Sequence, residues 1–157
     1  MTDPSARAAA PPDARVSTAW VAARLHDPDV RLLALEAARA LGMPGRVPGT
    51  VDAAAARGLA ELDGAGFAGR MRAIGARADT VLVLYGGDDD EPADAARRAL
   101  AGLGHADVVV MEGGLARWIA EGRPLAVEVP RYPPSDYADP AQALAEGAAA
   151  ARDERRA

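Results

Sequence analysis

The hydrophobic pattern of the chain centres on one short run of apolar residues. Val81 to Tyr85 is an unbroken apolar segment, and it runs directly into Gly86, Gly87 and an acidic cluster. An apolar run of this length between turn residues is typical of a strand buried on both faces, as in the middle of a parallel sheet. Ligand and catalytic sites in such sheets lie beyond the carboxyl ends of the strands. We therefore expect the loop that starts at Gly86 to be the place where chemistry would occur.

Other segments of the chain have the character of strands. Val30 to Leu35 and Asp107 to Met111 are predicted to form buried strands. Residues 42–49 are rich in Gly and Pro and indicate a loop, which leads into a short predicted strand at residues 50–52.

Helical periodicity fills the intervals between these strands. Ser17 can cap a helix that carries Trp20, Val21 and Leu25 on one stripe. Three further helices are predicted from the apolar stripes Phe67, Met71 and Ile74; Ala96, Ala99, Leu100 and Leu103; and Leu115, Trp118 and Ile119. We expect these helices to end at Gly75, Gly104 and Gly122. Because strands and helices alternate, the sequence predicts an open α/β sheet with right-handed crossovers.

The two ends of the chain differ in composition from its centre. Residues 1–14 are mostly Ala, Pro and polar residues, and we predict a disordered tail there. The alternating pattern places one domain at residues 15–129. Residues 130–157 read as a linker-like segment followed by a weak C-terminal helix, since the last residues are nearly all Ala and charged.

Charge and cysteine content argue against several classes of function. The net charge of −5 disfavours nucleic acid and anionic membranes as partners. The chain has no cysteine, so it has no thiolate for catalysis or for metal binding and no disulfide. No apolar run approaches the roughly 18 residues of a membrane span, and the first residues lack the apolar core of a signal peptide. We expect a cytoplasmic location.

Several segments resemble one known family, the rhodanese domains. Residues 104–125, which include Gly-Gly-Leu-Ala-Arg-Trp at 113–118, look like the C-terminal half of such a domain. Residues 45–51 are similar to the family's Gly-His-Ile-Pro-Gly-Ala-Val loop, and residues 16–20 resemble its opening. Residues 131–137 resemble the linker after the N-terminal, non-catalytic domain of two-domain thiosulfate sulfurtransferases. The resemblance implies a rhodanese-like α/β fold of about five mostly parallel strands with helices on both faces.

The same resemblance identifies the active-site loop. Rhodaneses carry sulfur as a persulfide on a cysteine at the first loop position after the central strand, and Gly86 occupies that position here. The equivalent loop consists of Gly86, Gly87, Asp88, Asp89, Asp90 and Glu91. In the family this loop holds an anion with backbone amides at a helix N-terminus, usually with added basic residues. Carboxylates in that place neutralise the helix dipole and repel thiosulfate.

Two more positions depart from the family pattern. Ala34-Leu35-Glu36 stands where the family has Asp-x-Arg after its second strand. Arg46 replaces the His of the Gly-His-Ile-Pro-Gly loop and is a weak candidate for binding an anion.

Each remaining candidate also has a simple structural explanation. The acidic cluster could hold Mg²⁺ or Ca²⁺, but its spacing is not that of an EF-hand loop, and solvation with helix capping explains it. Consequently no metal site is predicted. Structural or solvent-exposed roles are expected for Arg97, Arg98, His26, His105, Trp20, Trp118, Gly113 and Gly114.

Three hypotheses for the function follow, in order of preference. The first is a catalytically inactive rhodanese-homology domain that acts as a binding, regulatory or scaffold module for another protein chain, without a cofactor. The second is the supporting half of a split thiosulfate sulfurtransferase, working with a cysteine-bearing domain on another chain. The third is an enzyme with altered chemistry at the acidic loop.

Overall fold

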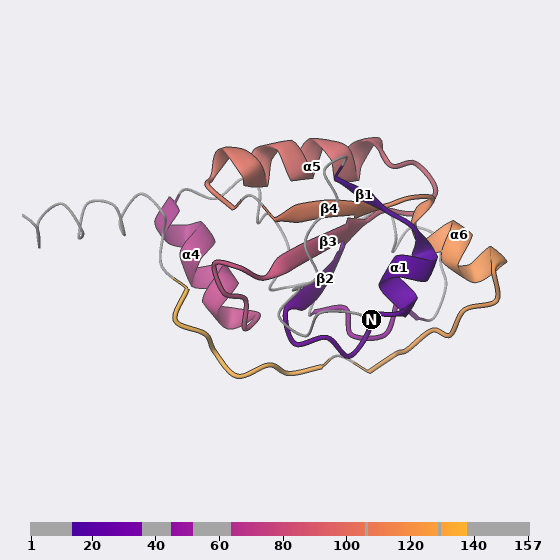
Figure 1. The fold of residues 1–157 in the computed structure, drawn as a ribbon, viewed down its shortest axis with the longest axis horizontal. Helices are drawn as coiled ribbons and strands as arrows, with labels where there is room; N and C mark the ends of the chain where they lie inside the picture. Colours follow the sequence, from indigo (N-terminus) through magenta and orange to yellow (C-terminus); the bar gives the residue numbers. More distant parts are fainter. Residues whose placement is uncertain (1–13, 36–44, 52–63, 106, 129, 138–157) are drawn as a thin grey trace, which may run out of the picture.

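A parallel sheet forms the centre of the computed structural model, which describes residues 14–35, 45–51, 64–105, 107–128 and 130–137 (Figure 1). Within these residues the sheet has four strands in the order β1-β4-β3-β2, and every neighbouring pair is parallel. The strands are β1 (Arg15–Val16), β2 (Val30–Ala34), β3 (Val81–Tyr85) and β4 (Val108–Met111). The predicted tail up to residue 13 and the predicted C-terminal helix lie outside the described residues.

Strand β3 is the central strand that the apolar pattern predicts. Its register with β2 runs from Val30 opposite Val81 to Ala34 opposite Tyr85, and Leu82 lies opposite Val108 of β4. All five β3 residues are buried. The α/β prediction is therefore confirmed.

The number of strands differs from the expected five in the part of the chain that the structure describes. The predicted strand at residues 50–52 contributes only an isolated parallel bridge between Leu32 and Thr50, and residue 52 is not described. Conversely, β1 was not predicted, because a two-residue strand is too short to show any periodicity in the sequence.

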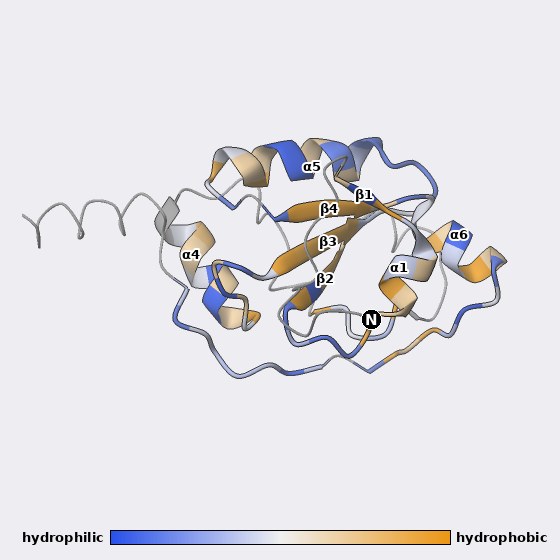
Figure 2. Cartoon of the chain, in the orientation of Figure 1, coloured by the Kyte–Doolittle hydropathy of each residue, from blue (hydrophilic) through white to orange (hydrophobic). Residues whose placement is uncertain are grey.

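Helices cover both faces of the sheet, as predicted. Alternate residues of a strand point to opposite faces. On one face of the sheet, Leu82 and Leu84 pack against α4 (Gly64–Ala73) and α5 (Glu91–Gly102). The helix residues in this cluster include Phe67, Met71, Ala93 and Leu100. Val81, Val83 and Tyr85 pack on the other side with Val21 of α1 (Thr18–Ala22) and with Leu115 and Trp118 of α6 (Gly114–Ala120). Figure 2 shows the apolar strands between helices whose outer surfaces are more polar.

The helix boundaries agree with the sequence in part. Ser17 caps α1 by accepting a hydrogen bond from the Trp20 amide at 3.0 Å, as predicted, but α1 ends at Ala22, so Leu25 lies beyond it. The predicted buried stripe of α5 is wrong at Ala99, which is exposed, while Ala93 is buried instead. Alanine carries little periodic signal, which explains this error.

The chain after α6 returns along the molecule to α4 (Figure 1). Residues 130–137 form neither helix nor strand, yet the Tyr137 side chain is only 3% exposed. No helix within the described residues is long and apolar enough to cross a membrane.

Candidate functional site

The loop after β3 is joined to the N-terminal end of α6 by backbone hydrogen bonds. The Gly86 carbonyl accepts from the Leu115 amide at 2.9 Å, and the Gly87 carbonyl accepts from the Ala116 amide at 2.8 Å. Both loop glycines are buried. The first two peptide units of the loop therefore act as acceptors for α6.

Gly114 makes this close approach possible. Its φ is +61°, and a Cβ atom there would lie 2.5 Å from the Gly87 carbonyl oxygen and 2.6 Å from that of Gly86. The Gly113-Gly114 pair is thus a tight strand-to-helix turn, in line with its expected structural role, and the turn fixes the position of the loop.

Gly86 itself has room for a small side chain. Its backbone lies outside the left-handed region, and an added Cβ would meet the Asp89 carbonyl oxygen at 3.0 Å. This contact is tight, but a shift of a few tenths of an ångström would relieve it. The position that the rhodanese resemblance assigns to a persulfide cysteine is therefore sterically compatible with cysteine.

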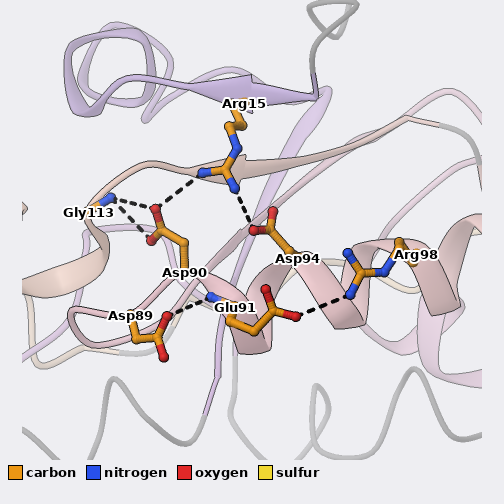
Figure 3. A network of polar contacts seen from close by, with 7 residues as sticks. All are labelled: Arg15, Asp89, Asp90, Glu91, Asp94, Arg98 and Gly113. Carbon is orange, nitrogen blue, oxygen red and sulfur yellow. Dashed lines mark hydrogen bonds and ion pairs between the residues drawn. The ribbon is translucent and has the colours of Figure 1, made fainter.

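Asp90 links the loop to two distant segments (Figure 3). Its carboxylate accepts hydrogen bonds from the Gly113 amide at 3.2 and 3.1 Å, and it pairs with the Arg15 guanidinium at 3.4 Å. Arg15 also forms an ion pair with Asp94 in the first turn of α5. The Asp90 carboxylate thus joins the loop to the Gly113 amide and to the Arg15 guanidinium at this end of the sheet.

The predicted capping role of the acidic cluster is only partly correct. Asp90 is the N-cap residue of α5, but its side chain makes no capping hydrogen bond because it is turned toward Gly113. Asp89 accepts from the Glu91 amide at 3.0 Å, and Glu91 pairs with Arg98 at 3.3 Å on the surface. Asp88, Asp89 and Glu91 are exposed. Among the described residues, no three or more His, Asp or Glu side chains are grouped so that they could hold a metal ion.

Arg15 is the residue of this site that sequence analysis missed. It is separated from Asp90 by 75 positions, and no local pattern marks it. The two-residue strand β1 that places Arg15 beside β4 is itself too short to be recognised in the sequence, so no signal pointed to this residue.

The weak candidate Arg46 takes part in a different contact, which its backbone makes with Ala126. Its backbone pairs with Ala126 in an antiparallel bridge, with N–O distances of 2.9 and 2.8 Å. Nearby, the Tyr85 hydroxyl bonds to Thr50 Oγ1 at 2.7 Å and accepts from the Val47 amide at 3.3 Å. Burial raises the pKa of Tyr85, so this hydroxyl remains neutral and structural.

Removing the Asp90 carboxylate should destabilise the domain. We expect Asp90→Ala to lower the free energy of unfolding by about 1–2 kcal/mol, because the Gly113 amide and Arg15 both lose an ionised acceptor. Asp88→Ala is the matched control, since Asp88 is exposed in the same loop, and its effect should stay within about 0.5 kcal/mol. Urea unfolding of both variants measures the difference, and equal effects would contradict this role of Asp90.

The sequence of the chain is similar to those of known proteins. The chain is 37% identical over 138 residues to the sulfur carrier protein TtuD of Thermus thermophilus, and 31% identical over 132 residues to a thiosulfate sulfurtransferase of Corynebacterium glutamicum. These matches cover 82% and 80% of the chain, but 47% and 44% of the relatives. The chain therefore spans about half the length of the curated relatives it matches.

The fold also matches a solved structure. This structure is SseA from Escherichia coli, which is described as having the rhodanese fold of 3-mercaptopyruvate sulfotransferases. It superimposes on this chain with a TM-score of 0.64 at 22% sequence identity, and the match covers 80% of this chain and 55% of SseA. Residues 17–121 match the profile of the rhodanese-like domain. With more than half of its length matched in this way, the chain belongs to the rhodanese-like domain family.

Proposed function

We propose that this chain is a rhodanese-family domain that transfers no sulfur itself and serves as a binding, regulatory or scaffold module. The observation that carries the proposal is the state of the loop after β3. Gly86 stands where the family resemblance places the persulfide cysteine, and the chain has no cysteine elsewhere to replace it. No other side chain in the chain can form a persulfide.

The surroundings of Gly86 support the same proposal. The relatives are named as a sulfur carrier and a thiosulfate sulfurtransferase, and thiosulfate is an anion that would have to approach the loop. Here the groups that would attract an anion, the Gly113 amide and the Arg15 guanidinium, already bind Asp90. Three exposed carboxylates in the same loop add a repulsive field.

A second candidate function is the supporting half of a thiosulfate sulfurtransferase, working with a cysteine-bearing domain on another chain. It is favoured by one observation, namely that the chain matches less than half of each curated relative. On this hypothesis, the cysteine-bearing domain takes the place of the part of those relatives that this chain does not match.

A sulfurtransferase assay separates the two candidates. We expect the purified chain to show no transfer of sulfur from thiosulfate to cyanide, and steady turnover by this chain alone would overturn the proposal. The assay is then repeated with a cysteine-bearing rhodanese domain from the same genome. An unchanged kcat/KM in the mixture favours the binding module, whereas an increase of tenfold or more that saturates with chain concentration favours the supporting half.

A further inference from the structure

The segment of residues 130–137, here called the strap, is held to the domain through Tyr132, Ser135 and Tyr137. The Tyr132 ring lies over the Arg31 guanidinium, 3.7 Å from its carbon to the ring centroid, and the Tyr132 hydroxyl donates to the Gly49 carbonyl at 3.2 Å. The Ser135 amide donates to the Arg72 carbonyl at 3.0 Å, and Arg72 in turn donates to the Tyr137 carbonyl at 2.8 Å. The strap is therefore docked although it has no regular structure.

His105 binds the end of the strap from inside the domain. It lies in the turn between α5 and β4 and is 1% exposed. Its Nε2 is 2.7 Å from the Thr80 carbonyl oxygen, and its Nδ1 is 3.1 Å from the Tyr137 hydroxyl. Because a carbonyl oxygen can only accept, Nε2 carries the hydrogen. Nδ1 of the neutral ring then accepts from the Tyr137 hydroxyl.

The groups around His105 favour this neutral form on balance. Burial is the largest effect and lowers the pKa of His105, while the Thr80 carbonyl, Asp107 and Asp79 act in the opposite direction. On the strap side, the Tyr137 and Phe67 rings lie 5.8 and 6.4 Å from the His105 ring. The Arg72 guanidinium donates to the Tyr137 carbonyl, and this cation cannot neutralise a charged histidine.

We propose that His105 and Tyr137 form an acid-sensitive clasp, in which a proton taken up at Nδ1 releases the strap while the sheet remains folded. A protonated Nδ1 can no longer accept from the Tyr137 hydroxyl, which would have to turn its hydrogen away and accept instead. Even then the charged ring would stay buried against the Tyr137 and Phe67 rings, which disfavours the docked state. The bond from Nε2 to Thr80 persists, since Nε2 is a donor in both states. Departure of Tyr137 is the change that lets water reach the charged ring, so the strap moves and the strands do not. This device is independent of whether the domain transfers sulfur.

The direction of the pH dependence follows from the lowered pKa. His105 binds its proton more weakly when the strap is docked, so docking is complete above the ordinary histidine pKa of 6.5 and weakens as the pH falls below it. Because one proton is taken up, the docking equilibrium can change by at most about tenfold per pH unit.

Amide hydrogen exchange of the full chain tests the clasp. The Ser135 amide reports the docked strap, and the Leu82 amide, which donates to the Asp107 carbonyl at 2.8 Å, reports the sheet. Between pH 7.5 and 5 we expect the protection factor of Ser135 to fall, by up to about tenfold for each pH unit below 6.5, while that of Leu82 stays constant. A constant Ser135 protection factor, or a parallel fall at Leu82, would overturn the proposal.

Two variants assign the effect to His105. His105→Gln retains a donor for Thr80 but does not titrate, so the protection of Ser135 should become independent of pH. His26→Gln is the matched control, because His26 is exposed, and it should leave the wild-type pH dependence unchanged. If His105→Gln does not fold, an NMR titration of the His105 ring in the variant Tyr137→Phe provides a second test. Its pKa should differ from that in the wild type, and an identical pKa would refute the clasp.

Discussion

Gly114→Ala should lower the free energy of unfolding by about 3 kcal/mol or more, one of the largest effects of any conservative substitution in this chain. The left-handed backbone of Gly114, at φ +61°, costs a residue with a Cβ about 1–2 kcal/mol. The new Cβ would also lie 2.5 and 2.6 Å from two backbone carbonyl oxygens, which cannot move aside like the end of a side chain. Both costs act on the same residue, and the melting temperature should fall by about 10 °C or more.

Gly122→Ala separates these two contributions. Gly122 has a similar φ of +70°, but nothing lies within 4 Å of an added Cβ. Its cost should therefore be the backbone strain alone, about 1 kcal/mol. Thermal unfolding of both variants measures the difference, and hydrogen exchange at Leu115 and Ala116 shows whether the loop has separated from α6. Equal losses of stability would mean that the loop yields easily and that Gly114 does not fix its position.

The central strand and the loop could be predicted from local sequence. Five apolar residues followed by two glycines identify β3 and its end, and the apolar stripe of Phe67 and Met71 places them on a helix that faces the sheet. These features depend on neighbours within a few positions. Local pattern is therefore sufficient to place the candidate site at the carboxyl end of β3.

The contacts that give the site its character could not be predicted. Asp90 binds Gly113 and Arg15, which are 23 and 75 positions away, and a capping role was the better local expectation for an aspartate before a helix. Likewise, Tyr137 in the linker-like segment carries no local sign that His105, 32 positions away, binds its hydroxyl. For each of these side chains the sequence neighbours suggest one role, and a contact with a residue distant in the sequence gives it another.

Cysteine placed at Gly86 should react slowly until the exposed carboxylates of the loop are neutralised. In Gly86→Cys the introduced thiol is the only one in the chain, so alkylation reports it alone. The backbone can accept the side chain if the Asp89 carbonyl, 3.0 Å from the added Cβ, moves slightly. The nearby carboxylates then disfavour the thiolate, against the favourable field of the α5 N-terminus.

Neutralisation of the exposed carboxylates tests this account without breaking the Asp90 network. Asp88→Asn, Asp89→Asn and Glu91→Gln remove three charges but leave Asp90 bound to Arg15 and Gly113. Added to Gly86→Cys, they should raise the alkylation rate at pH 7 on the order of tenfold. The same three changes added to Gly102→Cys should have little effect, because Gly102 lies at the far end of α5 in open space. The measurement is alkylation rate against pH for all four variants.

If Gly86→Cys alone already gives a fast thiol with a low apparent pKa, the acidic loop does not disable the site. The anion cradle would then be intact apart from its missing nucleophile, which would point to an enzyme that has lost its cysteine rather than to a loop reshaped for binding.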